Sequence, residues 1–187
     1  MNVYDFDKTI YDGDSTVDFW KWCLKTYPAT RRDLLAQGVW GLGFGLRIVP
    51  KTKFKQNFYR FLKRLPDTNK AVLDFWSEHK KKIKGWYLES KRPDDVIISA
   101  SPEFLLAPIC EELGVERMMA SRVDSASGLY TGVNCHGEEK IVRFREFYRD
   151  EQIEAFFSDS HSDDPMARIS PKAVWVNGDE RTDWKFK

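Results

Sequence analysis

Two acidic residues near the start of the chain, Asp5 and Asp7, directly follow a short apolar run that ends at Tyr4. A carboxylate can act as a nucleophile, and a neighbouring carboxyl group can carry protons as a general acid and base. Two acids at this spacing also occur by chance, and a solvated turn accounts for them equally well. The pair therefore gains meaning only from polar residues that occur later in the chain.

Three further groups of polar residues appear later, each beside a predicted strand or helix. Ser99 follows one apolar run, Lys140 begins a predicted helix, and Asp159 follows another apolar run. Asp163 and Asp164 come shortly after Asp159. Taken singly, Ser99 is explained as a helix cap and Lys140 as a surface lysine. These separate explanations do not account for the joint pattern, in which polar residues follow one predicted strand after another.

The elements that must position these groups alternate between strands and helices. Short apolar runs at 96–98, 117–121, 155–157 and 173–176 predict buried strands of a parallel sheet. Stretches 102–113 and 138–148 predict helices, the first of them closed by Gly114. This alternation predicts an α/β fold in which helices flank a parallel sheet. Ligands of such sheets lie beyond the carboxyl ends of the strands, where the polar residues stand.

The stretch 15–94 interrupts the alternation, because it contains helical patterns and no convincing strand. Aromatic and aliphatic residues recur there at helical spacing, at positions Phe54, Phe58, Phe61, Leu62 and Leu65 and again at Val72, Phe75, Trp76 and His79. We interpret them mainly as the core of a helical insert. The predicted organisation is a catalytic core of 1–14 and 95–187 with a helical cap of 15–94. Glycines in 122–135 predict a small hairpin.

The ordered set of motifs resembles the haloacid dehalogenase (HAD) superfamily, in its phosphatase branch with a cap inserted after the first motif. The residues that carry the resemblance are Asp5-Phe6-Asp7-Lys8-Thr9, Ile98-Ser99-Ala100-Ser101, Lys140, and Ser158-Asp159-Ser160-His161-Ser162-Asp163-Asp164-Pro165. They span nearly the whole chain. The resemblance implies a Rossmann-like core, a helical cap and hydrolysis of a phosphomonoester.

The resemblance also implies catalytic roles for both early aspartates. Asp5 would attack phosphorus and form an aspartyl phosphate, and Asp7 would protonate the leaving oxygen and later activate water. Repulsion between a carboxylate and a phosphate requires cations, since each unit pair costs on the order of 4 kcal/mol at ~4 Å and an effective dielectric of about 20. Mg²⁺ would be held by Asp5, Asp159 and the Asp7 carbonyl.

The remaining motif residues would bind the phosphoryl group or support its ligands. Lys140 would place a positive charge on the phosphoryl oxygens, and Ser99 and Ala100 would bind them as well. Asp163 would act behind the ligands, on a metal-bound water or on Lys140, and Asp164 is a weaker candidate for the same role. His161 stands in the same loop and could face the mouth of the site, although a surface histidine without a role is the simpler interpretation.

The substrate is left open between two classes, of which a small phosphorylated metabolite is the first. Phosphoserine phosphatases hold their amino acid with an acid, for which Asp14 could stand, and with a cap arginine, at whose position Phe58 appears. Without that arginine, phosphoserine is a doubtful substrate. The alternative is a lipid phosphate, because the later motifs also resemble phosphatidylglycerophosphatase C-like enzymes. The apolar segment 39–46, flanked by basic residues, could contact a membrane surface, although packing inside the cap is favoured.

The overall composition limits partners and location. The formal net charge is +1, and the basic run Lys80, Lys81, Lys82 and Lys84 is typical of a solvated face, so we predict no nucleic-acid partner. Three widely spaced cysteines predict neither disulfides nor a zinc site, and with no leader before the first motif they indicate the cytoplasm. The oligomeric state is left open.

Two alternatives from other classes share parts of this pattern. A phosphate-accepting signalling domain combines acids, magnesium, a hydroxyl and a lysine at strand ends, and an idle family member could bind a partner through its cap. Asp7 opposes the first alternative, because a stable phosphoaspartate needs no acid and base. Intact motifs oppose the second.

Overall fold

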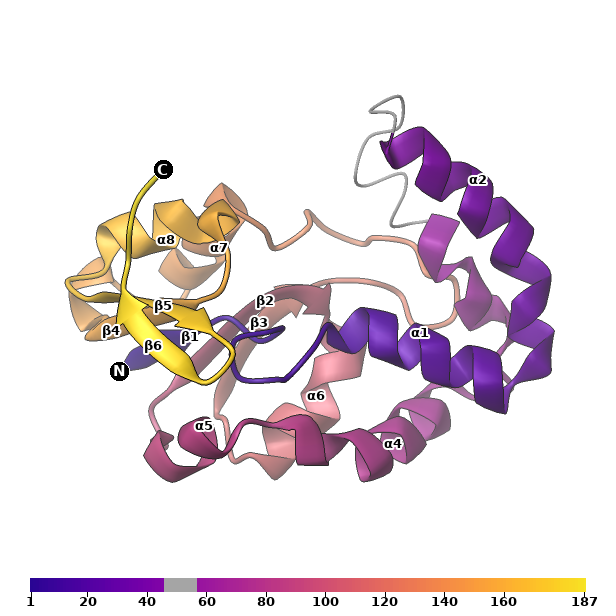
Figure 1. Cartoon of the computed structure of the whole chain (residues 1–187), viewed down its shortest axis with the longest axis horizontal. Coiled ribbons are helices and arrows are strands. Elements are labelled where there is room, and N and C mark those ends of the chain that lie inside the picture. The colour runs from indigo at the N-terminus through magenta and orange to yellow at the C-terminus, as the bar shows by residue number, and fades with distance from the viewer. Residues whose placement is uncertain (46–56) are drawn as a thin grey trace.

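The computed structural model describes residues 1–45 and 57–187, without the side chains of residues 36, 40, 42–44 and 151. A six-stranded sheet lies at its centre, in the order β3-β2-β1-β4-β5-β6 (Figure 1). The strands are β1 (Asn2–Tyr4), β2 (Val96–Pro102), β3 (Arg117–Ser121), β4 (Ala155–Ser158), β5 (Ala173–Asn177) and β6 (Glu180–Asp183). All neighbouring strands pair in parallel except β5 and β6. The predicted α/β, Rossmann-like fold is confirmed.

Alternation along the strands sends side chains to both faces of the sheet. Tyr4 and Ile97 belong to one hydrophobic core, and Val3 and Ile98 belong to the other. Helix α6 (Glu103–Glu112) packs in the first core, while α7 (Glu138–Arg145) and α8 (Asp164–Ile169) pack in the second. Because both faces are covered, the central strands β1, β2 and β4 carry apolar residues that point to both faces rather than alternating between apolar and polar residues.

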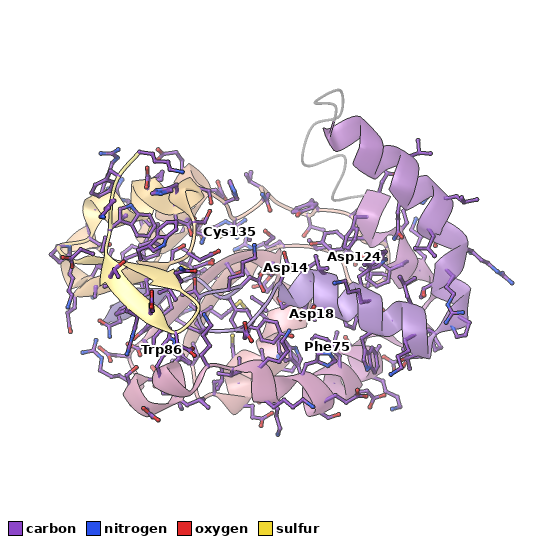
Figure 2. All side chains as sticks on the ribbon, viewed as in Figure 1. Asp14, Asp18, Phe75, Trp86, Asp124 and Cys135 are labelled. Carbon is purple, nitrogen blue, oxygen red and sulfur yellow. The ribbon has the colours of Figure 1, made fainter. Side chains whose placement is uncertain are left out.

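The segment predicted as a cap contains helices and no strand among its described residues. Its elements are α1 (Ser15–Thr26), η1 (Pro28–Asp33), α2 (Leu34–Gly45), η2 (Tyr59–Arg64), α4 (Thr68–His79), η3 (Lys80–Lys82) and α5 (Gly85–Ser90). Phe75 of α4, labelled in Figure 2, packs against Phe19 and Trp22 of α1. The Trp76 indole donates to the Leu105 carbonyl of α6 at 2.6 Å, so α4 also contacts a helix that covers the sheet. The division of the chain into core and cap stays a prediction.

The loop after the first strand is held by the basic run of the sequence. Lys8 adopts a left-handed backbone conformation with φ of 58°. The buried Lys84 ammonium donates to the Lys8 carbonyl at 2.7 Å and to the Gly178 carbonyl at 2.5 Å. Lys82 pairs with Asp18 at 2.6 Å. Lys84 therefore stabilises the loop that carries Asp7, whereas Lys82 links η3 to α1.

Several predicted boundaries differ from the structure. Strand β2 runs on past 98 to Pro102, with a register shift between Ile98 and Pro102. The predicted hairpin is reduced to one bridge between Val123 and Tyr130. Strand β6 escaped prediction because its sequence, Glu-Arg-Thr-Asp, is polar and exposed throughout. Phe54 lies outside the described residues. In the part of the chain that the structure covers, no helix is long and apolar enough to cross a membrane.

Candidate active site

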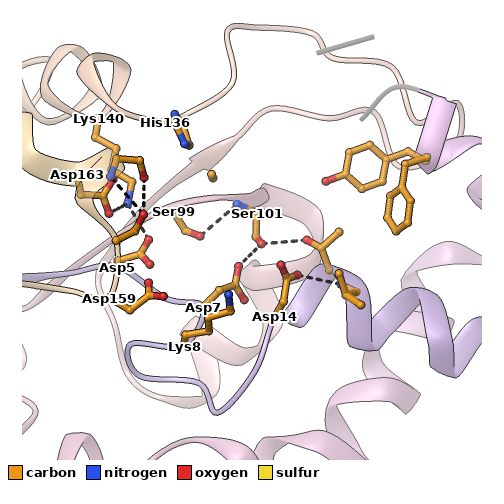
Figure 3. Close-up of a pocket in the computed structure, with 17 residues that line it drawn as sticks. Asp5, Asp7, Lys8, Asp14, Ser99, Ser101, His136, Lys140, Asp159 and Asp163 are labelled. Carbon is orange, nitrogen blue, oxygen red and sulfur yellow. Dashed lines mark hydrogen bonds and ion pairs between the residues drawn. The ribbon is translucent and has the colours of Figure 1, made fainter. Parts of the chain in front are cut away.

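The predicted site residues meet in one pocket of about 420 Å³ at the carboxyl ends of β1, β2 and β4 (Figure 3). The pocket is lined by Asp5, Asp7, Ser99, Ala100, Lys140, Asp159 and Asp163, all of which the sequence singled out, and by Lys8, Asp14, Thr16, Val17, Phe58, Tyr59, Ser101, His136, Ser160 and Ser162. Asp164 and His161 do not line it. The topology therefore converts four separate motifs into one constellation.

The Asp5 carboxylate forms a buried ion cluster with one ammonium and a second carboxylate. Lys140 Nζ lies 2.7 Å from Asp5 Oδ1 and 2.7 Å from Asp163 Oδ2. Burial raises the pKa of Asp5 to about 7, although the charge of Lys140 opposes this shift. Burial alone would lower the pKa of Lys140, but the attraction of both carboxylates leaves it raised. Lys140 is therefore a fixed cation beside the candidate nucleophile.

The support behind this cluster comes from the strand ends. The Asp5 N–H donates to the Phe157 carbonyl at 2.9 Å, which ties β1 to β4 where the site begins. Ser158 Oγ donates to Asp163 Oδ2 at 2.7 Å. Thr9 Oγ1 accepts from the Asp159 N–H at 3.1 Å. The sequence included Thr9 in the first motif without giving it a role, and the structure places it between the two loops that carry the acids.

The surroundings of the acids fit a divalent cation with oxygen ligands. Asp5 and Asp159 offer carboxylates, and burial raises the pKa of Asp159 as well, so a further positive charge would favour both ionised forms. Asp163 Oδ1 is buried without a hydrogen-bond partner within the described residues. No group of three or more His, Cys, Asp or Glu side chains converges as a metal cluster in that part of the chain. Such a sparse set suits Mg²⁺, which keeps several waters and uses one or two carboxylates.

Asp7 lies in a different environment, because its partners are neutral. The Ser15 N–H donates to Asp7 Oδ1 at 2.7 Å, and the Ser101 hydroxyl donates to Oδ2 at 2.5 Å. Burial raises the pKa of Asp7 to about 6, helped by the charge of Asp14 and opposed by these hydrogen bonds. A carboxyl group with this pKa exchanges protons readily near neutral pH, which suits a general acid and base.

Ser99 is oriented by its own strand. It is buried, and its hydroxyl oxygen accepts from the Ser101 N–H at 3.1 Å (Figure 3). Because that contact uses the oxygen as acceptor, the hydroxyl proton can be given to a phosphoryl oxygen. Ser101 thus touches both Ser99 and Asp7. Ser101 stands in the same motif as Ser99, but the sequence analysis assigned it no role.

The outer wall of the pocket is built mostly by the segment predicted as cap. Phe58 and Tyr59 line it, whereas Arg60 is exposed and does not. His136 lines the pocket from the core side. His161 does not line the pocket; it stacks on Trp175 with 4.5 Å between ring centroids and contacts Asp164 at 3.2 Å.

The family model for haloacid dehalogenase-like hydrolases matches residues 3–168. The chain belongs to this family. The match takes in every strand end that carries a site residue, and it confirms the resemblance of the motifs. The HAD family thus accounts for the mostly parallel sheet and for the order in which the acids, serine and lysine occur.

Three similar proteins place this HAD family member among its relatives. It is 31% identical over 93 residues to Protein CicA of Caulobacter vibrioides, covering 46% of this chain and 41% of that protein. It is 27% identical over 106 residues to histidinol-phosphatase of Neisseria meningitidis, covering 50% and 48%. A structure of a protein of unknown function from Bordetella pertussis Tohama I shares the fold, with a TM-score of 0.74, 18% identity and coverage of 94% and 88%. The matched part spans less than half the length of these curated relatives.

Proposed function

We propose that this HAD family member is a Mg²⁺-dependent phosphomonoester hydrolase that acts through an aspartyl phosphate on Asp5. The supporting observation is the contrast between two carboxylates two residues apart. Asp5 is paired with the Lys140 ammonium, whereas Asp7 is held by neutral donors. One carboxylate is thus placed beside a cation that draws in a phosphate, and the other is left to exchange protons.

In this mechanism, an Asp5 carboxylate oxygen attacks phosphorus and the bond to the leaving oxygen breaks. That oxygen takes a proton from Asp7, which leaves Asp7 ionised. Water then attacks the aspartyl phosphate and gives a proton to Asp7, so phosphate departs and both carboxyl groups return to their starting forms. Lys140 and the Ser99 hydroxyl stabilise the charge on the phosphoryl oxygens. A Mg²⁺ bound by Asp5, Asp159 and the Asp7 carbonyl would offset the charge of the attacking carboxylate and the phosphate.

Turnover of an aryl phosphate tests this proposal against both alternatives from other classes. We expect many turnovers with Mg²⁺, loss of activity in excess chelator, and recovery when Mg²⁺ is restored. A signalling domain would accept one phosphate and release it slowly, and an idle binding protein would release none. Full activity after exhaustive metal removal would contradict the magnesium assignment.

For the substrate, we propose a small phosphorylated metabolite whose leaving group lacks a carboxylate. No arginine lines the pocket among the described residues, and Phe58 stands in its wall. A carboxylate would therefore lack a bidentate partner there. The relative named histidinol-phosphatase makes histidinol phosphate one compound to assay. We expect it, or another amino-alcohol phosphate, to exceed O-phosphoserine in kcat/KM, and the reverse order would contradict the proposal.

A lipid phosphate is the second candidate, favoured by the surface of α2. Leu35 and Val39 of this helix are 87% and 72% exposed, and Arg31 and Arg32 are exposed just before it. Apolar side chains beside basic ones can bind an anionic membrane surface. The protein should co-sediment with anionic vesicles, and the double variant Leu35→Ser, Val39→Ser should stay in the supernatant. Equal sedimentation of both proteins would contradict membrane contact through α2.

The free, buried cysteines favour a cytoplasmic location.

A further inference from the structure

The Ser101 hydroxyl lies where the candidate acid and base meets the first turn of α1. It donates to Asp7 Oδ2 at 2.5 Å and lies 2.9 Å from Thr16 Oγ1 and 3.4 Å from Ser15 Oγ. Ser101 is only 4% exposed, and Ser15 is fully buried. The Ser101 hydroxyl of β2 thus contacts Asp7 (Figure 3) and, on its other side, the hydroxyls of Thr16 and Ser15 from α1.

The protons in this group can be assigned by counting donors. An ionised Asp7 carboxylate only accepts hydrogen bonds, so the single Ser101 proton points to Asp7. The Ser101 oxygen then remains an acceptor, and Thr16 donates to it. Because a hydroxyl can also accept, Ser101 can keep its contact with Asp7 when Asp7 carries the proton. The arrangement therefore holds the carboxyl group through both halves of a proton transfer.

The second Asp7 oxygen is fixed from the same helix. Ser15 N–H belongs to the first turn of α1, where amides lack partners within the helix, and it donates to Asp7 Oδ1 at 2.7 Å. With one donor on each oxygen, the plane of the carboxyl group is set, and further lone pairs remain for the transferred proton. Ser101 supplies the donor from the sheet, and Ser15 supplies the donor from α1.

We propose that Ser101 is a positioning residue for Asp7, which holds the carboxyl group in line with the leaving oxygen. This inference rests on the proposed function, in which Asp7 protonates that oxygen. Proton transfer by a positioned group contributes roughly 10²–10⁴-fold, and misplacement by about 1 Å can cost 10²-fold. Loss of the Ser101 hydroxyl should therefore slow reactions that need the proton more than reactions that do not.

The test compares 4-nitrophenyl phosphate with phenyl phosphate, which have similar rings but different leaving groups. Phenolate is the more basic and needs protonation more. Ser101→Ala should lower kcat/KM for phenyl phosphate about tenfold more than for 4-nitrophenyl phosphate. In an Asp7→Asn background the same substitution should add no such preference, because the group it positions is gone. A Ser101→Ala loss equal for both substrates, or a preference that persists in that background, would overturn the inference.

Ser121→Ala is the matched control. Ser121 is also a fully buried serine, and its hydroxyl donates to the Ala100 carbonyl at 3.0 Å rather than to Asp7. Ser121→Ala should change kcat/KM by the same factor for both substrates. Should Ser101→Ala fail to fold, Ser101→Cys allows the same comparison, since a thiol is a weaker donor. A wild-type protein that hydrolyses neither substrate would overturn the proposed function and this inference together. If the wild-type protein is active and Ser101→Ala lowers kcat/KM equally for both substrates, only the inference about Ser101 is overturned.

Discussion

The two ends of the active-site pocket differ in the chemistry of their side chains. At the phosphate end, Asp5, Lys140 and Asp163 form a buried ion cluster on strand ends and the start of α7. At the outer end, Asp7 contacts hydroxyl and amide groups, and Phe58 forms part of the wall. Charges fixed on the sheet suit a step that every phosphomonoester shares. Neutral groups from β2 and α1 and an aromatic ring from the segment predicted as cap suit the part of a substrate that varies.

This comparison predicts that substitutions at the two ends differ in kind. A change at the phosphate end should affect all substrates alike, because each presents the same phosphoryl group. A change at the outer end should affect substrates unequally, according to their leaving group or their shape.

The largest effect is expected at Asp5. Asp5→Asn keeps the size of the side chain but removes the nucleophile, so kcat should fall by at least about 10⁴-fold with every substrate. Steady-state assays of several phosphomonoesters measure this. Asp12→Asn is the control, because Asp12 stands in the same loop, is exposed and does not line the pocket. An Asp5→Asn protein that keeps activity towards even one of these compounds would show that another group attacks phosphorus.

The next effect is expected at Lys140 and concerns stability as well as activity. Lys140→Met leaves two carboxylates buried without their cation, and breaking such a buried pair typically costs about 3–5 kcal/mol of unfolding free energy. Denaturant unfolding in excess chelator measures this loss. Lys70→Met, in the exposed pair of Lys70 with Asp74, should change stability little. Equal stability changes in the two variants would mean that the cluster around Lys140 is solvated.

A smaller and selective effect is expected at Phe58. Its ring lines the pocket and packs on Trp20 with 5.4 Å between ring centroids. Phe58→Ala should raise KM for ring-bearing phosphates by about 3–10-fold with little change in kcat, because the ring would contact the bound substrate and the transition state equally. Phe147→Ala, which removes an exposed ring elsewhere, is the control. A fall in kcat that is equal for all substrates would place Phe58 with the phosphate end instead.

The phosphate end was predictable from the sequence; at the outer end Asp7 and Phe58 were named, but the groups that hold Asp7 were not. Asp5, Ser99 and Asp159 follow apolar runs, and parallel strands bring their carboxyl ends together, so sequence order was enough. Lys140 followed from its place in the ordered motifs, near the start of a predicted helix. The contact of Ser101 with Ser15 was missed because it joins residues 86 positions apart, next to a register shift in β2 that the sequence pattern does not predict. Strand β6 was missed because an exposed edge strand needs no apolar side chains.

The central claim is a covalent phosphate on Asp5, and Asp7→Asn tests it most directly. This variant keeps the Asp7 carbonyl but can neither protonate a leaving group nor activate water, so hydrolysis of the aspartyl phosphate should slow by roughly 10²–10⁴-fold. An aryl phosphate with a good leaving group needs little protonation, so the first step should suffer less. Rapidly quenched Asp7→Asn protein should then show a burst of phenol and, by mass spectrometry, a phosphate on the peptide that contains Asp5. The Asp5→Asn, Asp7→Asn double variant should show neither. A phenol burst without a phosphate adduct would contradict the aspartyl-phosphate mechanism.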